Sequence, residues 1–141
     1  MLKDLIASGY GTDPNDFEHS YNCAERILNG ANLVYNLGMD EKTLNMASGC
    51  GGGMYVGTTC GTITAAVMVV GRLETNFNQH QTPSLKLKLE KMLGDYEKDI
   101  GSLLCKDLRP QYFEQQKCLP LLLKTAEMLD NYYLELQKEH R

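Results

Sequence analysis

The chain has 141 residues, enough for one hydrophobic core, so we expect a single domain over residues 1–141. Its 14 Lys and Arg and 18 Asp and Glu give a net charge of −4, and no basic block marks a nucleic-acid-binding surface. The longest apolar run, residues 63–70, is far below the ~20 residues that span a bilayer. The first residues show no secretory pattern, so we expect a cytoplasmic protein without membrane insertion.

Two helices are expected in the first third of the chain. Residues 20–37 place apolar side chains at the 3.6-residue period of a helix, with Ser20 as its N-cap. Asp40 is expected to cap a short helix over about residues 41–48, and the glycines at 51–53 are expected to end it. Both segments fit an amphipathic helical protein.

A segment over residues 60–73 is expected to be a buried central helix, because it is apolar on all sides and has no strand partner of similar strength. Three more helices are expected over about residues 83–100, 101–108 and 119–138, the first of them with Pro83 as its first residue. The sequence therefore predicts an all-α fold, a bundle of about five to seven helices around this central helix.

The five cysteines are the residues most able to carry chemistry, and they are Cys23, Cys50, Cys60, Cys105 and Cys118. No two of them have CxxC spacing, which argues against a zinc ribbon, a thioredoxin-type motif and haem attachment. In a reducing compartment, five cysteines are not a framework of permanent disulfides. Taken singly, each is expected to be a small buried side chain, because free cysteine is among the most buried residue types.

Three of these cysteines lie in or beside the first turn of an expected helix: Cys23, Cys60 and Cys118. A first turn has unpaired backbone N–H groups and the positive end of the helix dipole, and both favour a thiolate and lower the pKa of a thiol. Gly61 leaves the backbone beside Cys60 open to close approach. Cys23 also lies on the apolar face of its helix, so core packing is an equal alternative for it.

The order of these features resembles a known family. Asn22 and Cys23 open a helix, "MASGCGGGM" and "TTCGTITAAVMVVG" follow, and single cysteines stand in "GSLLCKDL" and "QKCLP". Over roughly residues 20–130 this resembles the C_GCAxxG_C_C family, whose description is redox activity. The resemblance implies that the family's four characteristic cysteines are Cys23, Cys60, Cys105 and Cys118, with Cys50 as an additional fifth.

The family's CGAxxG motif reads CGTITA here, so Thr62 replaces its Ala and Ala65 replaces its second Gly. Ala65 removes a position at which a partner helix or a cofactor can approach closely.

Two other candidates carry less weight. The Gly-rich loop before Cys60 precedes a helix start, as phosphate-binding loops do, but it lacks the P-loop lysine and does not fit GxGxxG after a strand. His19, four residues before Cys23, is a candidate proton partner or ligand, although a solvated loop histidine is the favoured interpretation.

Three functions follow from these observations. The first is a thiol redox protein with Cys60 as the attacking thiolate and Cys23 or Cys118 resolving, which needs no cofactor and exchanges electrons with an unidentified partner protein or small thiol. The second is a zinc or iron–sulfur site held by Cys23, Cys60, Cys105 and Cys118. The third is a non-catalytic helical binding module. A homo-oligomer and enzymatic activity are both left open.

Overall fold

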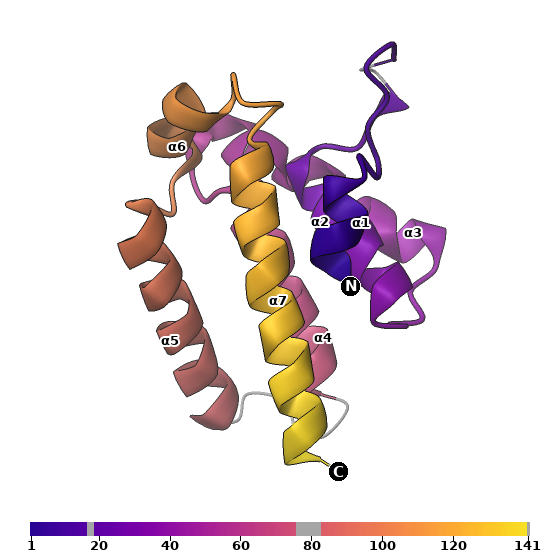
Figure 1. Cartoon of the computed structure of the whole chain (residues 1–141), viewed down its shortest axis with the longest axis vertical. Coiled ribbons are helices and arrows are strands. Elements are labelled where there is room, and N and C mark those ends of the chain that lie inside the picture. The colour runs from indigo at the N-terminus through magenta and orange to yellow at the C-terminus, as the bar shows by residue number, and fades with distance from the viewer. Residues whose placement is uncertain (17–18, 76–82, 141) are drawn as a thin grey trace.

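The computed structural model describes residues 1–16, 19–75 and 83–140. These residues form seven α-helices, one 3₁₀-helix and one π-helical turn, with no strand, so the predicted all-α fold is confirmed (Figure 1). None of these helices combines the length and apolarity needed to cross a bilayer. The elements are α1 (Leu2–Ala7), α2 (Cys23–Val34), α3 (Glu41–Leu44), η2 (Asn45–Cys50), η3 (Gly53–Gly57), α4 (Gly61–Glu74), α5 (Pro83–Ile100), α6 (Cys105–Tyr112) and α7 (Leu119–Glu139).

Helix α4 is the central element, as the sequence predicted. It packs against α2, α5 and α7, and α7 runs beside it along much of its length (Figure 1). Its Ala65, Ala66 and Val69 are fully buried in the larger of two hydrophobic cores, which also takes side chains from α1, α2 and α7. Ala65, one of the two departures from the family motif, therefore lies where helices pack against one another.

A second, smaller core lies under α5, α6 and the start of α7. Its buried members are Cys60, Ile63, Tyr96, Leu108 and Leu121. Helix α5 contributes Tyr96 from the side opposite to α1, α2 and α3 (Figure 1). One of the chain's five cysteines is thus a core residue, and the other candidate cysteines lie around it.

Several element boundaries differ from the sequence prediction. The N-cap of α2 is Asn22 and not Ser20: the Asn22 side chain accepts a hydrogen bond from the Glu25 backbone N–H, and the Glu25 carboxylate accepts one from Asn22 in return. The helix predicted at 41–48 is α-helical only to Leu44 and continues as the 3₁₀-helix η2. Helix α1 was not predicted, because six residues are too few to show a helical period.

Helix α6 begins at Cys105, four residues after the predicted start at 101. Gly101 adopts φ +105°, a left-handed conformation that ends α5. Leu104 then forms an isolated antiparallel bridge with Thr59, so this part of the chain is extended before α6 begins. A pairing between residues so far apart in sequence leaves no periodic signal.

Candidate thiol site

Four cysteines lie at the starts of four different helices. Cys23 and Cys105 are the first residues of α2 and α6, and Cys60 and Cys118 are the N-caps of α4 and α7. The helix-start placement predicted for Cys23, Cys60 and Cys118 is confirmed, and the structure adds Cys105 to it. All five cysteines are free thiols.

The Thr59–Leu104 bridge holds Cys60 and Cys105 on neighbouring segments. The Cys60 backbone N–H donates to the Leu103 carbonyl at 2.7 Å, and the Cys105 N–H donates to the Thr58 carbonyl, also at 2.7 Å. These two bonds bring the starts of α4 and α6 together, although the two cysteines are far apart in sequence.

Glycines at two positions leave room for the Cys23 and Cys105 side chains beside the backbone. A Cβ on Gly61 would lie 2.5 Å from the Cys23 sulfur and 2.8 Å from the Cys50 carbonyl oxygen. A Cβ on Gly53, whose φ is +63°, would lie 2.7 Å from the Cys105 Cβ. The close approach expected at Gly61 is therefore found, and the sulfur that uses it belongs to Cys23.

The thiols influence one another electrostatically. Burial raises the pKa of Cys23 to about 11, with Cys60 and Cys105 adding to the rise, and backbone hydrogen bonds involving Gly52 and Ala24 opposing it. Burial likewise raises the pKa of Cys118 to about 11, and the nearby thiols that add to this are Cys23, Cys60 and Cys105. The pKa of Cys105 is also raised, by burial and then by Cys60. The four cysteines named by the family resemblance are therefore neighbours.

These pKa directions correct one expectation. The helix starts were expected to lower the pKa of Cys23 and Cys118, but the loss of hydration at these buried positions exceeds what the helix N-termini supply.

A cavity of about 540 Å³ opens onto three of the four thiols. Cys23, Cys105 and Cys118 line it, whereas Cys60 is only 5% exposed and is not among the lining residues. The structure therefore places Cys60, the attacking thiolate of the sequence-based hypothesis, behind the thiols that reach the cavity.

Three cationic side chains also line this cavity: Arg26, Arg109 and Lys117. None of the three was predicted from the sequence. Arg26 follows Cys23 by three residues and Arg109 follows Cys105 by four, spacings that place each pair on one helix face, so a search for cations beside the cysteines could have found them. No comparable signal marks Lys117, which lies in the loop before α7.

A buried polar chain leads inward from Cys60. Its sulfur lies 3.3 Å from the Thr62 hydroxyl oxygen, and the Thr125 hydroxyl donates to Thr62 at 3.1 Å. Burial raises the pKa of the Tyr96 hydroxyl to about 12. Within the described residues, this hydroxyl forms no hydrogen bond of its own. Thr62, the other departure from the family motif, thus places a hydroxyl in contact with the buried thiol.

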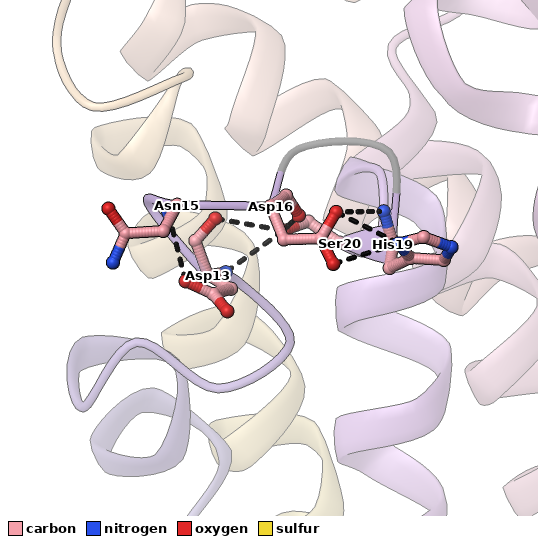
Figure 2. A network of polar contacts seen from close by, with 5 residues as sticks. All are labelled: Asp13, Asn15, Asp16, His19 and Ser20. Carbon is pink, nitrogen blue, oxygen red and sulfur yellow. Dashed lines mark hydrogen bonds and ion pairs between the residues drawn. The ribbon is translucent and has the colours of Figure 1, made fainter.

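Neither Cys50 nor His19 lines the cavity. Cys50 ends η2 and packs against the larger core. His19 is 79% exposed, and Figure 2 shows its ring against the Asp16 carboxylate, with Nδ1 2.8 Å from the nearer oxygen. This matches the favoured interpretation of His19 as a solvated loop residue. Ser20, which the sequence predicts to be a helix cap, accepts a hydrogen bond from the Asp13 N–H in the same loop.

The zinc or iron–sulfur alternative requires several ligands around one point. In residues 1–16, 19–75 and 83–140, no group of three or more His, Cys, Asp and Glu side chains is arranged to hold a metal ion.

Fold and site together define an all-α protein with four neighbouring thiols at helix starts. A family model described as "Putative redox-active protein (C_GCAxxG_C_C)" matches residues 21–132, and the chain belongs to this family. The family resemblance seen in the sequence is thereby confirmed. Neither the comparison with curated proteins nor the comparison with solved structures gave a match.

Proposed function

We propose that this protein is a thiol–disulfide redox protein whose working cysteines are Cys23, Cys60, Cys105 and Cys118. The observation that carries the proposal is their arrangement: four thiols from four helices influence one another's pKa, and three of them line one cavity. In the reaction, two thiols give up two electrons and two protons to an oxidised partner and join as a disulfide. Membership of a family described as redox-active supports the same function.

Within this group, we assign the attack to Cys105 and the resolving role to Cys118. Both line the cavity, and the positive charge of Arg109 opposes the rise in the pKa of both thiols. The pKa of Cys118 rises to about 11, whereas the pKa of Cys105 rises less. Cys105 therefore reaches its thiolate form more readily, and the thiolate is the nucleophile in disulfide exchange.

The raised pKa values also suggest the direction of electron flow. Strongly oxidising dithiol proteins owe that character to a stabilised thiolate in the reduced form. Here burial disfavours the thiolates of Cys23 and Cys118. The reduced protein lacks that stabilisation, so we expect it to act as an electron donor.

The test is to oxidise the reduced protein with one equivalent of diamide, which accepts two electrons and two protons, and to count thiols by alkylation and mass spectrometry. We expect the five thiols to fall to three, with a peptide linking Cys105 to Cys118. Cys105→Ser and Cys118→Ser should lose this link, and Cys50→Ser, the matched control that does not line the cavity, should retain it. Five thiols that persist in the wild-type protein would overturn the proposal.

A further inference from the structure

The cavity is positively charged, although the chain as a whole is not. Its described lining residues include three cations, Arg26, Arg109 and Lys117, and one acid, Glu25, whereas the chain has a net charge of −4. The Glu25 carboxylate already accepts a hydrogen bond from the Asn22 backbone N–H at 3.1 Å, as part of the α2 cap. Arg109 favours the thiolates, but thiol–disulfide exchange needs no second or third cation, so the charges of Arg26 and Lys117 point to an anionic ligand.

Arg26 and Lys117 lie close enough for their positive charges to repel each other. The Arg26 side chain is only 4% exposed and donates hydrogen bonds to the backbone carbonyls of Tyr10 and Ile6, at 2.9 and 3.4 Å. Burial lowers the pKa of Lys117, and the charge of Arg26 lowers it further. An anion in the cavity would be attracted by both groups and would relieve this repulsion.

Arg109 joins the charged side of the cavity to the thiols. Its guanidinium stacks over the Phe113 ring, with 4.3 Å from Cζ to the ring centroid. The same side chain favours the thiolates of Cys105 and Cys118. A carboxylate that pairs with Arg109 would therefore hold the rest of its molecule next to the two thiols.

Building on the proposed thiol redox function, we propose that the cavity binds a low-molecular-weight disulfide that carries carboxylate groups, and that the pocket thiols reduce it. A volume of about 540 Å³ is in the range typical of small-molecule sites. The cations bind the carboxylates, and the thiols act on the sulfur–sulfur bond between them.

The reaction balances within the protein and this substrate, RS–SR. The Cys105 thiolate attacks one substrate sulfur, which breaks the S–S bond, forms a mixed disulfide and releases RS⁻, which takes up a proton. Cys118 then loses its proton and attacks the Cys105 sulfur, which releases the second RSH and leaves a Cys105–Cys118 disulfide. Two electrons and two protons pass from the protein to the substrate.

The test compares three disulfides of different charge: glutathione disulfide (anionic), bis(2-hydroxyethyl) disulfide (neutral) and cystamine (cationic). The oxidation rate of the reduced protein by each is divided by the rate for free dithiothreitol, which corrects for intrinsic reactivity. We expect the corrected rate to be at least about 10-fold higher for the anionic than for the cationic disulfide, and the ratio to fall as salt is added.

Variants locate the effect in the cavity. Arg109→Gln and Lys117→Gln should each lower the anionic-to-neutral ratio several-fold, and Arg109→Lys should retain most of it. Lys86→Gln removes an exposed cation of α5 that does not line the cavity, so it should leave the ratio unchanged. The two Gln variants test the same ratio independently, so misfolding of one leaves the other informative.

The outcomes separate the two proposals. If none of the three disulfides oxidises the protein, the redox function fails and this inference fails with it. If the neutral and cationic disulfides react as fast as the anionic one, the redox function stands and the charge selectivity is wrong. Unchanged ratios in both Gln variants would also overturn the inference.

Discussion

The Cys23 thiol shows which of two opposing effects decides its ionisation. It lies at the start of α2, where a helix N-terminus typically favours a negative charge by about 0.3–1 kcal/mol, and at most about 2. Yet its pKa rises from an ordinary value of 9.0 to about 11, which corresponds to roughly 3 kcal/mol against the thiolate. Burial therefore outweighs the helix start, and Arg109 becomes important as a charge that favours thiolates at Cys105 and Cys118.

Gly61 is the residue on which the approach of α2 to α4 depends most. Alanine at this position would place a methyl group 2.5 Å from the Cys23 sulfur, a distance that requires the two helix starts to move apart. We expect Gly61→Ala to lower the free energy of unfolding by about 1–3 kcal/mol, as overpacking of a core does. Urea denaturation of the reduced protein measures this.

The same helix offers a matched control for this prediction. Gly71 also lies in α4, but a Cβ there meets nothing within 4 Å. Gly71→Ala should leave stability unchanged or raise it by up to about 1 kcal/mol, because alanine has the higher helix propensity. Equal stability of the two variants would contradict the close approach at Gly61.

At the scale of elements, the start of α2 is tied to the loop that covers the thiols. The Asn22 side chain caps the helix by accepting from the Glu25 N–H at 2.9 Å, and its amide nitrogen donates to the Ser48 carbonyl at 2.9 Å. The same amide nitrogen donates to the Tyr55 hydroxyl at 3.2 Å. A single side chain thus joins α2, η2 and η3, which all surround the cavity.

Loss of the Asn22 cap should lower the stability of the protein more than loss of a cap whose side chain makes no further hydrogen bonds. We expect Asn22→Ala to lower the free energy of unfolding by about 1–2 kcal/mol, because both the cap and the bonds to Ser48 and Tyr55 are lost. Asp40→Ala, the control, removes a cap bond to Thr43 at the start of the four-residue helix α3 and should cost less than half as much. Chemical denaturation midpoints compare the two, and a larger loss for Asp40→Ala would refute this view of Asn22.

The helices show which parts of the fold can be predicted from the sequence. Helices α2, α5 and α7 were predicted from their apolar periods, and α4 from its length and its apolar character on all sides. These predictions place Cys23, Cys60 and Cys118 in or beside the first turns of helices. The position of α6 was missed because the Thr59–Leu104 bridge, a pairing distant in sequence, sets it.

The shape of the cavity could not be predicted from the sequence either. Gln116, Lys117 and Cys118 all have positive φ, between 51° and 65°, although none of them is a glycine or asparagine. Tertiary packing imposes this conformation, so the sequence carries no sign of it. The same applies to Met54 and Tyr55 in η3. The sequence thus named the cysteines, but not which of them reach the cavity.

At the scale of the whole molecule, the thiols lie at both hydrophobic cores: Cys23 packs against the larger one, Cys60 is part of the smaller one, and Cys118 packs against the smaller one. The larger core joins α1, α2, α4 and α7, while the smaller one lies under α5 and α6 and contains Cys60. Cys105 belongs to α6 and Cys118 caps α7, on the two sides of the loop between these helices. A disulfide between them would fasten α6 to the central pair of helices.

Oxidation should therefore stabilise the whole molecule. A disulfide that closes a loop of about 13 residues restricts the unfolded chain, and for loops of this length the gain is about 3 kcal/mol. For a chain of 141 residues this corresponds to a rise in melting temperature of roughly 10 °C.

Calorimetry of the diamide-oxidised and the fully reduced protein measures the difference. Cys50→Ser should show the same rise, and Cys118→Ser should show none. If the oxidised protein melts at or below the melting temperature of the reduced protein, a Cys105–Cys118 disulfide does not join α6 to α7 in the folded protein.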